Sequence, residues 1–412
     1  MKSKLIKRFI IYLVLGGGLV SCSPQGYGYV DKTGKVAIAP RFGDASDFSE
    51  GLAAVAIGQK SGYIDKTGKL VIFPVAGGGF PFSNGLAPVR RNSQWGHIDR
   101  TGKLAIGPQF DEAAKFSTRL AGLNMSDRYH SNTLGDTQPA LFEYVRYLGH
   151  IPYFSSGLAA VVQGNLWGYI DTTGKMAIPL QFAKATTFSE ELAAVKVGRC
   201  WGYINKTGKV VIPPRYHYAH SFSEGLADVQ IGDRWGYINK TGKVVILPQF
   251  DFIPSTFSEG LAVFQIDDLY GYMDKTGKAV IPPRFKQAES FSEGLARVQV
   301  NNQYGYIDKT GKMVIPPQFP AAQSFKEGLA AVLLHDGWSY IDLQGNVITK
   351  SRFKHAGSFS EGLAVVRTSG EVVRPPTGPT TQPALPQIIQ GKSFNYCNEL
   401  PKLNESLELD KS

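Results

Sequence analysis

The sequence predicts an all-β fold, a tandem array of ten repeats of about 34 residues, each a three-stranded antiparallel sheet. Two observations lead to this fold class. A hexapeptide related to FSEGLA recurs at intervals of 34, 34, 38, 34, 34, 35, 34, 34 and 34 residues. Aromatic residues make up 12% of the chain and glycine occurs 46 times, which is typical of β structure with many turns. The copies begin at Phe48, Phe82, Phe116, Phe154, Phe188, Phe222, Phe257, Phe291, Phe325 and Phe359.

The copy that begins at Phe222 shows the elements of one repeat. Residues 226–231 (LADVQI) and 235–238 (WGYI) are rich in β-formers and flank a short polar turn, so they predict a hairpin. Residues 239–243 (NKTGK) match a type I turn followed by a left-handed glycine, with the side chain of Asn239 accepting a local backbone hydrogen bond. A third strand at 244–246 (VVI) follows. Its counterpart in the preceding copy is expected to end at Pro213-Pro214, because proline cannot donate to a β ladder.

All five tryptophans of the chain occupy the first position of the aromatic–glycine step. Core packing is the favoured interpretation, with each ring lying on backbone of a neighbouring repeat. The alternative is a row of exposed rings that binds carbohydrate. Tyrosine replaces tryptophan in three copies, Ser61 in another, and Ser339 replaces the glycine in the last. The five residues are Trp95, Trp167, Trp201, Trp235 and Trp338.

Three short strands cannot bury a face alone, so each copy must gain its core from the copies beside it. An open or spiral solenoid is the expected arrangement, and a closed β-propeller-like ring is the alternative. Propellers usually have roughly four strands per blade and four to eight blades, which fits ten three-stranded copies less well.

Two runs carry a specific family resemblance. WGYINKTGKVVIPPRY at 201–216, followed by FSEGLADV at 222–229, resembles the bacterial WG-repeat family. The resemblance covers about residues 26–366 and implies a β-repeat protein whose activity is usually unassigned. It therefore supports the architecture and leaves the biochemistry open.

The first 21 residues predict a signal peptide. Four basic residues precede an apolar run at 9–20, which is too short to span a membrane comfortably. Leu19-Val20-Ser21-Cys22 resembles a lipoprotein lipobox, which implies that Cys22 becomes the lipid-bearing N-terminus. We therefore expect an exported, membrane-anchored lipoprotein, in the outer membrane if the cell is Gram-negative, since Ser23 follows the cysteine.

The repeat array is expected to span residues 22–366, with a degenerate repeat at about 117–153. That copy lacks the aromatic–glycine step and the KTGK turn. Because it departs from the scaffold, Asp127, Arg128, His130 and His150 are candidate surface residues for a ligand or partner, although drift in a tolerant loop is the favoured explanation.

Residues 367–412 predict a proline-rich tail without packed structure. Cys397 lies in this tail and Cys200 in a hairpin turn. The two thiols could pair in an oxidising compartment, but we expect them not to.

A basic ridge is predicted where the repeated turns line up, because each turn is flanked by lysine or arginine. The ridge would attract anionic glycans, lipid headgroups or acidic protein faces, unless its lysines serve only solubility. The net charge of +10 includes four charges in the segment expected to be cleaved, so nucleic acid is not an expected partner. The ridge residues are Lys32, Lys35, Lys66, Lys69, Arg100, Lys103, Lys175, Lys206, Lys209, Lys240, Lys243, Lys275, Lys278, Lys309 and Lys312.

Sequence motifs for catalysis are lacking. No phosphate-binding glycine loop or zinc-ligand spacing occurs, so we expect no enzyme, no cofactor and no metal site. The expected function is a lipid-anchored, non-catalytic interaction scaffold for protein or envelope glycan partners. A carbohydrate-binding module with exposed repeat aromatics is the alternative, and a hydrolase in the degenerate repeat is a distant one.

Overall fold

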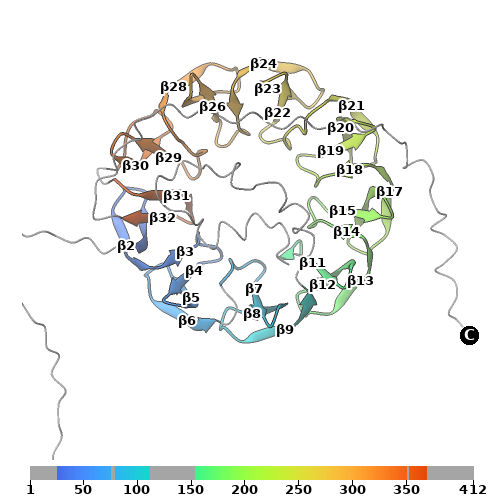
Figure 1. The fold of residues 1–412 in the computed structure, drawn as a ribbon, viewed down its shortest axis with the longest axis horizontal. Coiled ribbons are helices and arrows are strands. Elements are labelled where there is room, and N and C mark those ends of the chain that lie inside the picture. The colour runs from blue at the N-terminus through green and yellow to red at the C-terminus, as the bar shows by residue number, and fades with distance from the viewer. Residues whose placement is uncertain (1–25, 76–78, 112–153, 350–351, 369–412) are drawn as a thin grey trace, which may run out of the picture.

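The computed structural model describes residues 26–75, 79–111, 154–349 and 352–368. These residues form nine small antiparallel sheets arranged as a closed, propeller-like ring (Figure 1). Within the described residues, no helix is long and apolar enough to cross a membrane.

The nine sheets follow one another around the ring in chain order (Figure 1). The first sheet contains β2 (Val36–Phe42), β1 (Gly26–Asp31), β32 (Leu363–Thr368) and β31 (His355–Ser360). The second contains β3 (Asp44–Ala45), β4 (Leu52–Ile57), β5 (Lys60–Asp65) and β6 (Leu70–Val75). The third contains β7 (Leu86–Arg91), β8 (Gln94–Asp99) and β9 (Leu104–Asp111). The fourth sheet contains β10 (Phe154–Ser155), β11 (Leu158–Gln163), β12 (Leu166–Asp171) and β13 (Met176–Phe182). The fifth contains β14 (Lys184–Ala185), β15 (Leu192–Val197), β16 (Cys200–Asn205) and β17 (Val210–Tyr216). The sixth contains β18 (Tyr218–Ala219), β19 (Leu226–Ile231), β20 (Arg234–Asn239) and β21 (Val244–Phe250). The seventh sheet contains β22 (Leu261–Ile266), β23 (Leu269–Asp274) and β24 (Ala279–Phe285). The eighth contains β25 (Gln287–Ala288), β26 (Ala296–Val300), β27 (Gln303–Ile307) and β28 (Met313–Phe319). The ninth contains β29 (Leu329–Leu334) and β30 (Gly337–Asp342).

The all-β repeat array is confirmed, and its arrangement is the closed alternative. The expected open solenoid is wrong, because β1 from the start of the array pairs along its length with β32 from the end, from Gly26↔Thr368 to Asp31↔Leu363. One sheet thus contains both ends of the array and joins the ring (Figure 1).

The repeat unit also differs in detail from the three predicted strands. Five of the nine described sheets gain a two-residue strand at the inner edge of the ring: β3, β10, β14, β18 and β25. The third strand continues through its prolines, so the expected end at Pro213-Pro214 is wrong: β17 runs to Tyr216. The prolines are tolerated because β17 is the outer edge of its sheet and has no further neighbour that needs an N–H.

The predicted turn is confirmed. In the first copy Gly34 N donates to Asp31 O at 2.9 Å, and the φ of Gly34 is 78°, in the left-handed region that glycine adopts without a steric cost. The Asp31 carboxylate accepts hydrogen bonds from Thr33 N at 2.9 Å and Thr33 Oγ1 at 2.6 Å. The hydroxyl of Thr33 is the main cause of a lowered pKa of Asp31.

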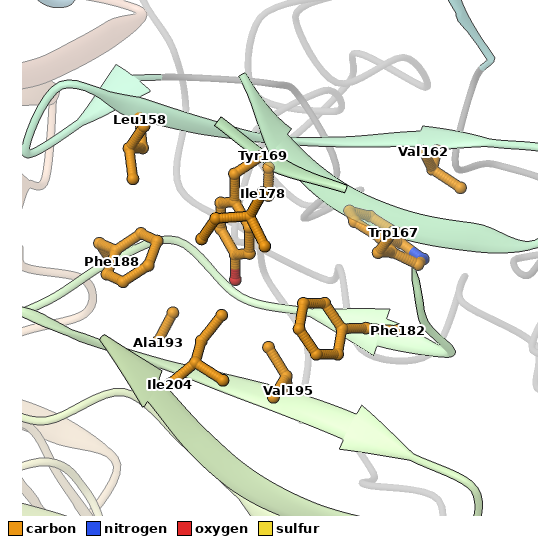
Figure 2. Packing of buried hydrophobic residues seen from close by; sticks show 11 residues of the cluster. Leu158, Val162, Trp167, Tyr169, Ile178, Phe182, Phe188, Ala193, Val195 and Ile204 are labelled. Carbon is orange, nitrogen blue, oxygen red and sulfur yellow. The ribbon is translucent and has the colours of Figure 1, made fainter. Parts of the chain in front are cut away.

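The cores lie between neighbouring sheets, as predicted from the small size of one repeat. Figure 2 shows Trp167, Tyr169 and Ile178 of one sheet facing Val195 and Ile204 of the next. Each sheet therefore completes the hydrophobic core of its neighbour.

A tyrosine recurs at the centre of these cores. Its ring packs against the phenylalanine of the FSEGLA motif, and the Tyr169–Phe188 ring centroids lie 4.8 Å apart. The Tyr169 hydroxyl donates to Thr186 O at 2.7 Å. The same hydroxyl-to-carbonyl bond forms in seven other sheets, from Tyr29, Tyr63, Tyr203, Tyr237, Tyr272, Tyr306 and Tyr340.

The sheets on either side of residues 112–153 are direct neighbours. Ser83 Oγ donates to Phe154 O at 2.7 Å, the same contact that Ser49 makes with Phe82 one regular repeat away. Trp95 and Phe154 also share one core cluster. Among the described residues no sheet lies between these two, and the tenth copy, at Phe116, is outside them.

Candidate functional site

On one face of the ring, the repeated turns join each sheet to the next through hydrogen bonds and ion pairs. The glutamate of each FSEG turn accepts a hydrogen bond from a glycine N–H of the next sheet, as from Gly260 to Glu224 at 3.0 Å. The first lysine of the next sheet's KTGK turn binds the same carboxylate, as Lys275 does at 3.1 Å. Burial acts to raise the pKa of Glu224, but the hydrogen bonds from Lys275 and Gly260 hold it below its usual value.

These ion pairs reduce the positive charge of the predicted basic ridge. The first lysine of six described turns is paired, Lys206 with Glu191 and the other five with the glutamate of an FSEG-type turn, so its charge is locally compensated, whereas the second lysine of the turns remains exposed. The ridge is therefore a belt of alternating charge with an excess of lysine. The other five pairs are Lys32–Glu327, Lys66–Glu361, Lys240–Glu190, Lys275–Glu224 and Lys309–Glu259.

Most of the predicted aromatic positions are inside the cores. Trp95, Trp167, Trp201 and Trp235 are buried, and Trp338 is partly buried. These four buried rings offer no exposed platform for a sugar.

The glycine that follows each ring is needed by its own sheet rather than by a neighbouring repeat. A Cβ on Gly236 would lie 2.6 Å from Ile246 O in the adjacent strand. The β-bulge between Trp235 and Tyr237 brings that carbonyl close.

The remaining predicted site residues give a mixed picture. Cys22 and the candidates Asp127, Arg128, His130 and His150 lie outside the described residues. Cys200 is disulfide-bonded to a cysteine outside the described residues, so the expectation that it does not pair with Cys397 is neither confirmed nor contradicted. Its side chain is buried at the start of β16, on the hairpin turn that the sequence predicted.

A position that varies between sheets lies at the inner edge of the ring. In six sheets, a residue just before the FSEGLA motif donates its N–H to a carbonyl of the following strand at 2.8–3.2 Å. We call these two residues the inner-edge pair. The pairs are Ser46–Ala54, Thr186–Ala194, His220–Asp228, Ser255–Val263, Glu289–Arg297 and Gln323–Ala331.

The β18–β21 sheet carries a histidine–aspartate pair at this position. Asp228 is 1% exposed and stands where most sheets have alanine or valine. Its Oδ2 contacts His220 Nδ1, and its Oδ1 has no hydrogen-bond partner among the described residues. The hydrogen bond to Asp228 raises the pKa of His220, although burial acts in the opposite direction. The imidazole lies nearly parallel to Trp235, with ring centroids 5.3 Å apart.

The β25–β28 sheet carries a glutamate–arginine pair at the same position. Arg297 forms an ion pair with Glu289, and its guanidinium lies 4.8 Å from the ring centroid of Tyr304. Glu289 also accepts a hydrogen bond from Ser324 Oγ at 2.9 Å, beyond the end of its own sheet. This pair therefore also contacts the next repeat.

The β22–β24 sheet lies between these two and departs in its backbone. The interval from Phe222 to Phe257 is 35 residues, one longer than the usual interval, and the short inner strand is missing. We call the three sheets from β18 to β28 the variable sector. In the described part of the ring, this is where charged inner-edge pairs flank an irregular sheet.

The chemistry available in this sector is recognition by shape, charge and hydrogen bonds. Among the described residues, no three His, Cys, Asp or Glu side chains are grouped so that they could hold a metal ion. His217 and His220 bind different partners: His217 Nδ1 contacts Gly232 O at 2.9 Å. Sequence reasoning missed the inner-edge pairs, although the 35-residue interval was a visible signal for the irregular sheet.

A family model for the WG containing repeat matches nine segments of the chain. They are residues 27–60, 62–95, 95–118, 167–199, 201–235, 235–270, 270–304, 304–338 and 338–371. Among curated proteins, none matches the sequence.

Solved structures are similar to this chain at low sequence identity. A eukaryotic initiation factor superposes with a TM-score of 0.51 at 10% identity, covering 84% of this chain and 100% of the other. BamB from Moraxella catarrhalis gives 0.34 at 12% identity, covering 52% of this chain and 79% of its own. AztD from Citrobacter koseri gives 0.34 at 12% identity, covering 82% and 92%. At 10% identity the similarity to the initiation factor concerns the fold alone.

Proposed function

Because the chain belongs to the WG-repeat family and folds as a closed ring of repeated sheets, we propose that it is a non-catalytic interaction scaffold that binds a protein partner through its variable sector. The repeated residues make the same contacts between neighbouring sheets in each copy, so they do not distinguish one partner from another. Residues that depart from the repeat can do so.

The observation that carries this proposal is the clustering of departures at one place. His220–Asp228 and Glu289–Arg297 stand on either side of the β22–β24 sheet, which lacks the short inner strand, as the β7–β9 and β29–β30 sheets also do. Buried polar groups are expensive to place in a core, so a charged pair at a position that otherwise holds small or apolar residues is a candidate for function. Two such pairs beside one irregular sheet favour a recognition surface there.

We further propose that Cys22 carries the lipid that anchors this scaffold in the cell envelope. The proposal depends on the lipobox-like sequence Leu19-Val20-Ser21-Cys22. A Cys22→Ser variant is expected to leave the membrane pellet in cell fractionation, while the wild type stays in it. A variant that remains in the pellet after alkaline carbonate washing contradicts the anchor.

Glycan binding through the repeat aromatics is the weaker candidate, because four of the five tryptophan rings are buried. A hydrolase in residues 117–153 would leave the variable sector unused. If the chain is a scaffold that binds through the variable sector, residues 117–153 are expected to be dispensable for partner binding.

Cross-linked capture from envelope extracts tests the scaffold. The tagged full chain is compared with a variant that lacks residues 117–153, since the sheets on either side of this stretch are already in contact. We expect both proteins to retain the same partner at stoichiometric yield. If only the deletion variant fails to capture the partner, the binding site lies outside the variable sector. If neither protein captures a specific partner, the scaffold function is refuted.

A further inference from the structure

A groove opens between the β22–β24 and β25–β28 sheets. Its volume is about 520 Å³, and its lining is mixed. Ile253, Val263 and Tyr270 supply apolar surface, while Gln265 and Glu289 supply polar groups. Small-molecule and peptide sites in proteins commonly combine these features: an apolar surface with a few polar groups that fix orientation.

The groove exists because one strand is missing. In the preceding sheet, Tyr218 and Ala219 pair with Gln230 and Val229. The equivalent stretch of the β22–β24 sheet is residues 251–254, one residue longer, and Pro254 cannot donate a backbone hydrogen bond. Within the described residues, no strand pairs with the inner edge of β22. Ser255 still bonds to Val263, donating its N–H to Val263 O at 3.0 Å and accepting from Val263 N at its Oγ at 2.8 Å, so the open part of this edge is at Gln265.

An unpaired strand edge offers main-chain hydrogen bonds to an incoming chain. At the position of Gln230, whose carbonyl accepts from His217 N at 3.0 Å, Gln265 has no such partner from its own inner-edge segment in the described structure. Extended peptides bind proteins by adding to edges of this kind, and adjacent pockets then select their side chains.

Exposed apolar and acidic residues adjoin the lining residues Ile253 and Gln265 in the chain. Phe252 is 54% exposed and Ile253 is 60% exposed. Asp267 and Asp268 are exposed in the turn after β22, where Gln265 donates its Nε2 to Asp267 O at 2.8 Å. Asp251 is also exposed and forms an ion pair with Arg234. A chain whose formal charge is +10 thus presents carboxylates beside its exposed apolar side chains.

We infer that this groove binds an extended segment of a partner protein in which an apolar side chain is flanked by lysine or arginine. This inference rests on the proposed function and names the chemistry of the partner. The apolar side chain lies in the groove against Tyr270, the segment's backbone bonds to the inner edge of β22, and its basic groups face Asp267 and Asp268. A glycan would leave Phe252 and Ile253 uncovered, so a peptide fits this surface better.

The test uses a display library of random dodecapeptides selected on the full chain, followed by fluorescence anisotropy with the enriched peptides. A regularised variant replaces residues 251–254 by His-Tyr-Ala, the segment of the preceding sheet, and so restores the usual repeat length. Phe252→Ser/Ile253→Ser is the second variant, because it changes only exposed side chains. Leu247→Ser is the matched control, since Leu247 is 73% exposed and does not line the groove.

We expect apolar–basic motifs to be enriched, and both groove variants to lower affinity by at least about tenfold, whereas Leu247→Ser keeps it. Asp267→Asn/Asp268→Asn should weaken binding at low salt and matter less at high salt. Peptides that bind the regularised variant equally well, no enrichment, or groove-dependent binding of envelope oligosaccharides in place of peptides would each overturn the inference. If the regularised variant still captures the envelope partner, the groove is wrong and the scaffold stands; if the full chain captures none, the scaffold itself fails.

Discussion

The glycine of the aromatic–glycine step gives the sharpest test of how the repeat is built. In Gly236→Ala, the new Cβ would lie 2.6 Å from Ile246 O and 2.8 Å from Pro248 N. Both contacts are with backbone atoms, so no side-chain rotation can relieve them. The strands would have to separate against the Trp235↔Phe250 and Tyr237↔Ile246 pairings on either side.

The size of the effect follows from what must move. Overpacking a well-ordered interior typically costs about 1–3 kcal/mol, and a clash with backbone belongs at the upper end, about 3 kcal/mol. Gly225→Ala is the matched control. Gly225 has a φ of 85° but no atom within 4 Å of the added Cβ, so only the left-handed backbone opposes it, at about 1–2 kcal/mol. The chain itself accepts Glu191, with a φ of 74°, at the equivalent position.

Denaturation followed by circular dichroism should therefore show that Gly236→Ala loses more stability than Gly225→Ala. Hydrogen exchange supplies the local measurement: amides of β20 and β21 should exchange faster in Gly236→Ala and stay protected in the control. Equal stability of the two variants, with unchanged protection of β20 and β21, would show that the bulge does not require glycine.

Three further predictions concern other parts of the ring. Tyr203→Phe removes the hydroxyl that donates to His220 O at 2.8 Å and should lower stability by about 1–2 kcal/mol in chemical denaturation; no loss would mean that the carbonyl is otherwise solvated. The pKa of His220 is raised by Asp228, so this pair stabilises the fold fully below the unfolded-state pKa, and its contribution is lost as pH rises through the folded-state value. The stability gap between wild type and His220→Gln should accordingly shrink from pH 6 to pH 9, and a constant gap contradicts the assignment. Non-reducing peptide mapping should find Cys200 linked to Cys397, because the remaining cysteine is expected to carry lipid; recovery of Cys200 as a free thiol sinks this pairing.

The turns and strands could be predicted because their signals are local. Asp31, Thr33 and Gly34 form one turn through bonds that span at most four residues, so the short motif contains the whole cause of the structure. The strand pattern is similarly contained in a few residues of alternating character.

Ring closure could not be predicted, because it depends on how small rotations between sheets add up around the ring. The pairing of Gly26 with Thr368 joins residues at opposite ends of the array, and no local pattern announces it. The strand count that argues against closure is also misleading, since the short inner strands are only two residues long, as with Tyr218–Ala219.

The candidate site was missed for a different reason. The interruption at residues 117–153 is the largest departure in the sequence, while the one-residue lengthening before Phe257 is small. The consequence of this lengthening is visible only in the structure, where the inner strand is absent and Phe252 and Ile253 are exposed. His220 follows β18 and contacts Asp228 of β19, eight residues further along the chain, and the spacing of the two residues in the sequence does not reveal this contact.

The way the scaffold contacts the inner-edge pair explains why this position can vary. The buried tyrosine of each core bonds to the main-chain carbonyl of the first residue of the pair: Tyr203 to His220, Tyr237 to Ser255 and Tyr272 to Glu289. Every residue type has that carbonyl, so the core is completed whichever side chain the position carries. The bonds of the FSEG turn that join sheet to sheet at the rim use its serine, glutamate and glycine and do not involve the pair. Bonds from the pair to the next repeat, such as the one that Glu289 accepts from Ser324, depend on which side chain the position carries. Substitutions at the pair therefore alter the inner surface of the ring while the tyrosine and FSEG bonds stay in place, which makes this position the part of the repeat best suited to determine which partner is bound.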